Sequence, residues 1–235
     1  MILVNFEKTL PRFTLRAAFL VERGKTLVLW GESGAGKTTV LECVAGLAIP
    51  DRGEIILNET TVFSSFRGVS LPPQARGLGF VFHNYALFPH MNALENVAFA
   101  LSARESGARP GALHTFRTSS LASRFAGGKA RREKAMSILE RFRIAHLAKQ
   151  NPRSLSAGEQ QRLALARALA SRSDILLMDE PFTALDHRTR EQMWNEFSAI
   201  RDEKSMTVIL VTHQYDEALR LGDRVLTLRG GEVYE

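Results

Sequence analysis

The sequence has little of the features that would place a protein outside the cell or within a membrane. Its single cysteine, Cys43, cannot form an internal disulfide, and because its neighbours in sequence are apolar we interpret it as a small core residue. A reducing, cytoplasmic compartment fits this usage. The sequence also lacks an apolar run long enough to span a membrane, and its first residues lack the features of a signal peptide. We therefore expect any work at a membrane to pass through partner proteins.

A concentrated basic stripe is also missing. The 235 residues carry a net charge of +6, but much of the excess is spread between Arg104 and Arg143, among Ser, Gly and Ala. Such a distribution is typical of a solvated surface segment, so no nucleic-acid partner is expected. Hydrophobic residues make up 45% of the chain, which is enough to build the core of one or two domains.

The clearest motif that is present is a glycine-rich stretch, GESGAGKT at residues 31–38, between an apolar strand-like run and an apolar helix-like segment. The backbone N–H groups of such a loop, the positive end of the following helix and the lysine ammonium can surround phosphate oxygens, and the threonine hydroxyl can bind Mg²⁺. A chance turn would have to reproduce this pattern in the same strand-to-helix context. The predicted triphosphate-binding residues are Gly31, Glu32, Ser33, Gly34, Ala35, Gly36, Lys37, Thr38 and Thr39.

Two carboxylates follow a second apolar run. Residues 175–178 are typical of a strand buried on both faces, and Asp179 and Glu180 stand at its carboxyl end. Because buried carboxylates are costly without a cation, Mg²⁺ on a triphosphate is the natural partner: we expect Asp179 to hold the metal and Glu180 to polarise the attacking water. His213 ends another buried strand and is predicted to contact the terminal phosphate, although a plain hydrogen-bonding role would explain it when taken alone.

A third pattern, LSAGEQQR at residues 155–162, opens a long predicted helix. Ser156 and Gly158 would present a hydroxyl, backbone N–H groups and the positive end of the helix dipole to an anion. By itself the pattern is weak, because a simple serine N-cap explains it equally well.

Taken together, these motifs closely resemble the nucleotide-binding subunit of ABC transporters over nearly the whole chain. The residues that carry the resemblance are 31–38, 155–162, 175–181, 184–186 and 212–213. The resemblance implies a head-to-tail dimer that sandwiches ATP between the phosphate loop of one subunit and the 155–162 motif of the other. Each ATP site would use Lys37, Thr38, Asp179, Glu180 and His213 of one chain with Ser156 and Gly158 of its partner, and Asp186 would lie at the dimer seam.

The resemblance also implies what such a subunit does. It would hydrolyse ATP to ADP and phosphate, with Lys37, Glu180 and His213 as catalytic residues and ATP and Mg²⁺ as cofactors. Its partners would be integral membrane permease subunits and, indirectly, a substrate-binding protein, at the cytoplasmic face of the inner membrane. The rival interpretations are a soluble ABC ATPase acting on nucleic acid or ribosomes, which usually carries tandem cassettes or long coiled-coil insertions, and a binding module with weak hydrolysis.

A narrower resemblance concerns the imported substrate. Residues 69–73, 76–82 and 87–90 look like those of importers for sulfate, molybdate and polyamines or sugars, and are most like the molybdate/tungstate type. An oxyanion is therefore the expected substrate, with ferric-iron or polyamine and sugar importers as alternatives. The substrate cannot be read from this chain, because the substrate contacts lie on other subunits.

Three departures from the family pattern stand out. His83 occupies the position of the glutamine that touches Mg²⁺ and communicates with the membrane subunit, and imidazole is a less typical Mg²⁺ ligand that gains a proton in mild acid. Ala157 and Glu159 replace the usual Gly and Gln. The sequence ends at Glu235 without the C-terminal regulatory domain that many relatives carry, which puts feedback through such a domain in doubt.

The predicted fold class is α/β: a P-loop NTPase with a mainly parallel core sheet, an N-terminal antiparallel β subdomain and an inserted α-helical subdomain. We expect one ABC ATPase domain over residues 1–235, with 1–82 and 163–235 as the core and β subdomain and about 84–160 as the helical subdomain. Residues 102–128 are predicted to be a mobile insertion, and residues 60–76 are predicted to be loop-like. Phe13 is the nearest aromatic that could stack on adenine, but strand-core packing is the favoured interpretation.

Overall fold

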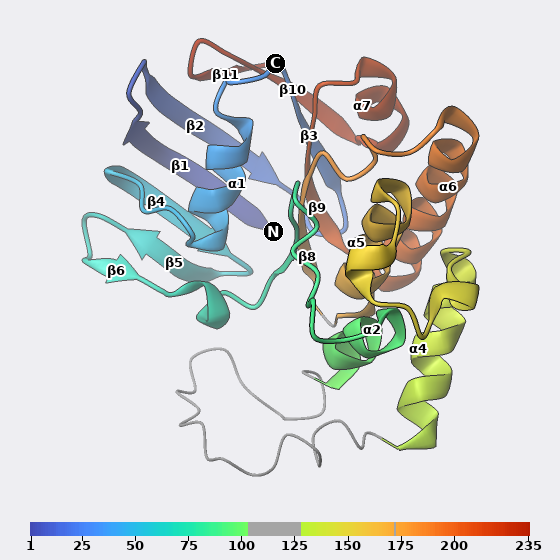
Figure 1. Ribbon diagram of the computed structural model, residues 1–235. Helices are drawn as coiled ribbons and strands as arrows, with labels where there is room; N and C mark the ends of the chain where they lie inside the picture. The colour runs from blue at the N-terminus through green and yellow to red at the C-terminus, as the bar shows by residue number, and fades with distance from the viewer. Residues whose placement is uncertain (103–127, 172) are drawn as a thin grey trace. The chain divides into compact units, whose positions relative to one another are not determined.

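The computed structural model describes residues 1–102, 128–171 and 173–235 (Figure 1). The predicted insertion therefore lies, apart from its two end residues, outside the described part of the chain. Two compact units are present. The first comprises Met1–Phe80, Ser173–Glu180 and Ser198–Glu235, and the second comprises Val81–Arg172 and Pro181–Phe197.

The first unit is built on a mixed sheet. Within the described ranges, eleven strands form this sheet. The final residue of the edge strand β7 (Gly79–Val81), Val81, is counted with the second unit. In spatial order the strands are β6 (Val69–Ser70), β5 (Thr60–Ser64), β4 (Arg52–Leu57), β1 (Ile2–Thr9), β2 (Thr14–Val21), β11 (Glu232–Tyr234), β10 (Arg224–Arg229), β3 (Thr26–Trp30), β9 (Thr207–Thr212), β8 (Ile175–Asp179) and β7 (Gly79–Val81).

The direction of pairing divides the sheet into two parts. β1 pairs antiparallel with β2 and β4, and β5 pairs antiparallel with β4 and β6. β10, β3, β9 and β8 pair in parallel. Figure 1 shows the antiparallel strands β1, β2, β4, β5 and β6 lying side by side.

Burial follows the two strand types. Every second residue of β2 is buried, whereas every residue of β8 and β9 is buried, as expected for parallel strands that are covered on both faces. Helix α1 (Lys37–Ala45) packs on β8 and β9. Its Val40, Leu41 and Val44 are fully buried in the same cluster as Leu29 and Val211.

The carboxyl end of α1 carries the single cysteine and a buried arginine. Cys43 is fully buried, which confirms its interpretation as a core residue, and burial raises the pKa of its thiol to about 12. The last carbonyls of a helix lack partners within the helix. Arg76 supplies a hydrogen-bond donor to two of these carbonyls, because its Nη1 donates to those of Cys43 and Val44 at 2.8 and 2.9 Å.

The prediction of a loop over residues 60–76 is wrong. This segment forms β5, β6 and a short 3₁₀ turn, η1 (Pro73–Ala75). Asn58 and Glu59 connect β4 to β5 with φ of 44° and 68°, the left-handed pair of a two-residue hairpin turn. Because Glu stands where glycine is usual in such a turn, the local signal for a hairpin is weak.

The second unit is helical. It contains α2 (Ala93–Ser102), α4 (Lys129–Arg141), α5 (Ala157–Ala170), the short turns η2 (Ala145–Leu147) and η3 (Pro152–Ser154), and the first part of α6 (His187–Lys204). α2 packs against both α4 and α5, with Val97, Leu139 and Leu163 fully buried. A capping box begins α2, because Asn92 and Glu95 exchange hydrogen bonds of 2.9 and 2.8 Å.

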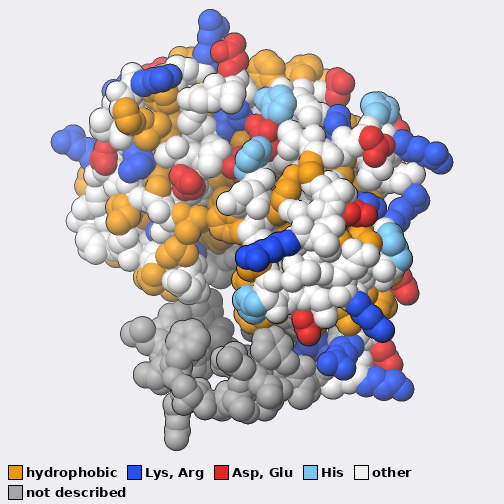
Figure 2. Space-filling model, in the orientation of Figure 1, with side chains coloured by type: hydrophobic (Ala, Val, Ile, Leu, Met, Phe, Trp, Pro, Cys, Tyr) orange, Lys and Arg blue, Asp and Glu red, His pale blue; other side chains and the backbone are white. Residues whose placement is uncertain are grey.

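The architecture agrees with the predicted fold class: a mainly parallel core sheet, an antiparallel N-terminal part and a helical segment inserted between β7 and β8. Across the described ranges, no helix combines the length and apolar character needed to cross a membrane. On the face drawn in Figure 2, Lys and Arg side chains are scattered among acidic and neutral ones instead of forming one patch.

Candidate functional site

The carboxyl ends of three neighbouring parallel strands meet at one edge of the sheet in the first unit. Trp30, Thr212 and Asp179 are the last residues of β3, β9 and β8, which lie side by side in that order. The phosphate loop follows β3, His213 follows β9, and Glu180 follows β8. Ligands of open α/β sheets bind at such an edge.

The phosphate loop needs glycine at two positions for different reasons. A Cβ at Gly31 would lie 2.4 Å from the carbonyl oxygen of Leu228, so no side chain fits there. Gly36 is the N-cap of α1 and has φ of 102°, a conformation that other residues rarely adopt. The loop thus passes tightly over the sheet and then turns sharply into the helix.

Lys37 is the first residue of α1 and is held against the loop. Its Nζ donates to the carbonyls of Gly31 and Glu32, both at 2.8 Å, and the residue is only 5% exposed. Burial lowers the pKa of the Lys37 ammonium, while the nearby carboxylates of Glu180 and Asp179 act in the opposite direction. The result is a positioned ammonium at a helix start, an arrangement suited to binding an anion.

Thr38 and Asp179 bring oxygen atoms together from the loop helix and from β8. The Thr38 hydroxyl donates to both carboxylate oxygens of Asp179, at 3.0 and 3.2 Å, and Asp179 is 4% exposed. Hydroxyl and carboxylate oxygens are ligands that Mg²⁺ prefers, and the ion commonly takes its remaining ligands from water and phosphate. Within the described ranges, no three His, Cys, Asp or Glu side chains group to hold a metal. The oxygen atoms of the Thr38–Asp179 pair fit a Mg²⁺ ion that takes its other ligands from phosphate and water.

Glu180 and His213 form a second pair beside the first. The Nδ1 atom of His213 lies 3.1 Å from Oε1 of Glu180, and the side chains are 48% and 18% exposed. Glu180 has φ of 49°, and its N–H donates to the carbonyl of Val211 at 3.0 Å. A left-handed residue other than glycine costs about 1–3 kcal/mol, and such strain often marks functional sites. A carboxylate paired with an imidazole is able to accept a proton from a bound water.

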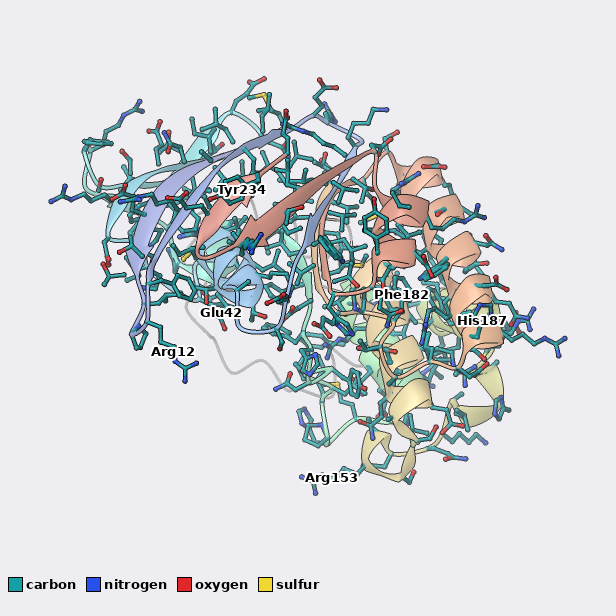
Figure 3. All side chains as sticks on the ribbon, turned by 90° about the horizontal axis from the view of Figure 1, so that it is seen from above. Arg12, Glu42, Arg153, Phe182, His187 and Tyr234 are labelled. Carbon is teal, nitrogen blue, oxygen red and sulfur yellow. The ribbon has the colours of Figure 1, made fainter. Side chains whose placement is uncertain are left out.

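A cavity of about 330 Å³ adjoins this group. It is lined by the turn between β1 and β2, including Arg12 and Phe13, by the phosphate loop and by Glu180. Figure 3 shows the Arg12 side chain at the tip of this turn, pointing away from the ribbon. Phe13 stands just before β2, so it is not a strand residue, but it packs on the core cluster as the favoured interpretation expected, and it also lines the cavity.

The remaining predicted residues of the loop lie around Lys37 and Thr38. They are partly or fully exposed at Glu32, Ser33, Gly34, Ala35, Gly36 and Thr39, and buried at Gly31.

The 155–162 motif belongs to the second unit and begins α5. Ser156 is the N-cap and forms a complete capping box with Glu159. Oε2 of Glu159 accepts from the Ser156 N–H at 2.8 Å and from its hydroxyl at 2.7 Å. These bonds, with the hydroxyl the larger cause, lower the pKa of the Glu159 carboxyl.

Three other predicted residues lie in the second unit. A Cβ at Gly158 would lie 3.3 Å from the carbonyl oxygen of Ala184, and the N–H of Ala184 donates to the Gln161 side chain at 3.1 Å. Asp186 accepts from the N–H of Thr189 at 3.0 Å, as an N-terminal cap of α6. His83 is exposed in the loop between β7 and α2.

The structure thus brings together Lys37, Thr38, Asp179, Glu180 and His213 within one unit, and it places Ser156, Gly158 and His83 in the other. Sequence reasoning missed the contribution of Arg12 to the cavity. The available signal was a proline and two bulky side chains at a hairpin turn, which is weak because such turns are usually only connections.

Comparison with known proteins places these motifs in context. The family model described as ABC transporter matches residues 16–183. The molybdate/tungstate import ATP-binding protein WtpC of Thermococcus kodakarensis is 39% identical over 232 residues, 98% of this chain and 62% of that protein. The spermidine/putrescine import ATP-binding protein PotA of Methylococcus capsulatus is 39% identical over 213 residues, 91% of this chain and 49% of that protein. The chain therefore spans between 49% and 62% of the length of these curated relatives.

Among solved structures, the dimeric post-hydrolysis state of the ATP-binding cassette MJ0796 bound to ADP and Pi is similar over the whole chain. It has a TM-score of 0.80 at 30% identity, and the match covers 100% of this chain and 97% of that one.

Proposed function

Because this chain belongs to the ABC transporter family, we propose that it binds and hydrolyses ATP as the energy-coupling subunit of an ABC importer. The observation that supports the proposal most directly is the convergence, at one sheet edge, of a held lysine, the Thr38–Asp179 pair and the Glu180–His213 pair. Each group matches one requirement of phosphoryl transfer: charge compensation, metal ligation and activation of water.

In this proposal the triphosphate lies along residues 31–38, and Lys37 carries a positive charge to its terminal phosphates. Thr38 and Asp179 would hold Mg²⁺, which would supply positive charge to offset that of the phosphates. The nucleoside lies in the cavity beside Arg12 and Phe13. His83 would be a further ligand or relay for the metal, as its position in the family pattern implies.

The hydrolytic step uses the second pair. Glu180 accepts a proton from water, the water oxygen bonds to the terminal phosphorus, and the bond from that phosphorus to the ADP oxygen breaks. His213 orients the Glu180 carboxylate and the water through the contact at 3.1 Å. The products are ADP and inorganic phosphate, the two molecules bound to the similar MJ0796 cassette.

We propose that two copies act head to tail, with Ser156 and Gly158 of one copy completing the phosphate site of the other. The dimeric state of MJ0796 supports this arrangement. ATP would then shift the equilibrium toward the closed dimer because it binds that state more tightly.

The partners in this proposal are permease subunits at the cytoplasmic face of the membrane and, through them, a substrate-binding protein. The second unit, as the helical subdomain, would contact the permease. An oxyanion such as molybdate or tungstate is the first proposed substrate, because the WtpC match extends over 98% of the chain. A polyamine is the alternative that the PotA match supports.

The test is ATP turnover and ATP binding of the E180Q variant. We expect Glu180→Gln to bind ATP within a few-fold of wild type and to release phosphate about 10²–10⁴-fold more slowly, the usual contribution of a general base. Glu191→Gln, on the exposed surface of α6, is the matched control and should turn over normally. Normal turnover in E180Q would remove Glu180 from its role, and wild-type protein that binds no ATP would reject the function.

The partner is tested by affinity purification from membranes with the ATP-bound E180Q protein. Recovery of a polytopic membrane protein is the expected result. Recovery of ribosomes or RNA in its place would reject the importer and favour a soluble ABC ATPase.

A further inference from the structure

We propose that Trp30 is a positioning residue that holds the His213 turn against the phosphate-loop strand and so keeps His213 paired with Glu180. The inference rests on the proposed ATP hydrolysis, in which Glu180 accepts the proton of water and His213 orients it. Trp30 itself would touch neither ATP nor the attacking water.

Trp30 contacts the His213 turn in two ways. Its indole Nε1–H donates to the carbonyl oxygen of His213 at 3.2 Å. Its ring meets the Tyr215 ring edge to face, with 5.4 Å between centroids and 68° between planes. The Trp30 side chain therefore contacts both the backbone of His213 and the side chain of Tyr215.

The position of Trp30 in the chain links these two contacts to the phosphate loop. Trp30 is the last residue of β3, pairs with Thr212 in the parallel register, and is followed directly by Gly31. The carbonyl of Gly31 accepts from Lys37 Nζ at 2.8 Å. The start of the phosphate loop and the His213 turn are thus tied through a single residue.

A buried polar pair also holds this turn. The Thr212 hydroxyl donates to Oε2 of Glu217 at 3.1 Å and accepts from the N–H of Gln214 at 3.0 Å. Glu217 is only 1% exposed. These bonds fix the residues on either side of His213, and the indole bond fixes the carbonyl of His213 itself.

The His213 side chain needs such support because it has little of its own. It is 48% exposed, and its contact with Glu180 is a single distance of 3.1 Å. Because about half of the imidazole is exposed, its direction depends in part on the orientation of its backbone. Loss of the indole donor should therefore reduce the time that His213 spends against Glu180.

The test compares W30F with wild type. Trp30→Phe keeps an aromatic ring against Tyr215 but removes the N–H donor, so we expect kcat for ATP to fall about two- to tenfold, as for one net hydrogen bond. KM should stay within about twofold, because the phosphate contacts are retained. A merely structural role would change the melting temperature and leave this split between kcat and KM absent.

A double-mutant cycle shows whether Trp30 acts through His213. We expect Trp30→Phe to cause no further loss of kcat in the H213A background. Unchanged kcat in W30F, or equal losses by W30F in the wild-type and H213A backgrounds, would overturn the inference while leaving the ATPase function intact. Wild-type protein without ATPase activity would instead reject the function.

A second measurement does not depend on turnover or on the stability of W30F. The chain has two tryptophans, so W194F protein labelled with ¹⁵N gives one indole N–H signal, that of Trp30. We expect this proton to exchange with D₂O at least about tenfold more slowly than a free indole, as one net hydrogen bond allows. Tyr215→Ala, at a half-exposed position, should speed the exchange. Exchange as fast as free indole in the W194F protein would overturn the inference.

Discussion

Replacement of Arg167 by methionine is expected to destabilise the second unit. Arg167 lies on α5, and its guanidinium donates to the carbonyls of Ala86 at 2.7 Å and Tyr85 at 3.1 Å. It also stacks over the Phe88 ring at 4.8 Å. Burial lowers the pKa of Arg167 to about 10, so the charge is held in a poorly solvated place.

The loop that Arg167 holds is strained. Tyr85 and Ala86 have φ of 64° and 43°, and a left-handed conformation costs an L-residue other than glycine about 1–2 kcal/mol. Both carbonyls accept from one side chain, and of the two bonds the one to Tyr85 is partly buried while the one to Ala86 is exposed, where water can replace it. The two hydrogen bonds and the cation–π contact together offset this strain.

The magnitude follows from the contacts. Two bonds from a charged donor contribute about 1 kcal/mol or more each, and the cation–π contact contributes about 0.5–1 kcal/mol. Allowing for partial relaxation, we expect R167M to lower the free energy of unfolding by about 2–4 kcal/mol. R167K should fall between, because an ammonium cannot form the two-pronged contact of a guanidinium.

The assay is urea unfolding followed by far-ultraviolet circular dichroism and by tryptophan fluorescence, whose coincidence tests two-state behaviour. Arg162→Met on the same helix is the matched control. Arg162 donates to the Arg143 carbonyl at 3.3 Å, so its loss should cost about 1 kcal/mol or less. An R167M protein within about 0.5 kcal/mol of wild type would refute the reasoning.

Two further predictions concern the proposed ATP cycle. Glu159→Gln should strengthen ATP-driven dimerisation at low salt, measured by size-exclusion light scattering. The substitution removes a negative charge, and a neutral amide holds the Ser156 hydroxyl less tightly than the carboxylate does at 2.7 Å. A dimer no tighter than the parent's would contradict this. Since the pKa of Glu159 is lowered, its capping contribution is present above the ordinary carboxyl pKa and is lost as pH falls through the lower folded value. His83→Gln should change the rate of phosphate release at saturating ATP, because imidazole is a less typical Mg²⁺ ligand than an amide oxygen; a rate equal to the parent's would exclude a role for His83 at the metal.

Strand and helix types were largely readable from local patterns. Local patterns predict the strands β3, β8 and β9 from their apolar runs and the start of α2 from the capping box at Asn92. They do so because the physical causes act between residues close in sequence. The hairpin from β4 to β5 was missed because its cause is not local. Its turn uses Asn58 and Glu59 at positive φ, a choice that pairing with neighbouring strands stabilises and that local preference does not.

The sequence by itself determined the chemical identity of the candidate site: a phosphate loop, a Thr and Asp for a metal, and a Glu and His for a water. Motif spacing encodes these because loop, strand end and helix start are each local. Only the tertiary structure decided which side chains meet. The parallel register of β3, β9 and β8 places Trp30, Glu180 and His213 within contact distance although they are far apart in sequence. Such pairings depend on strand order and on a left-handed residue after β8, and neither leaves a local trace in the sequence.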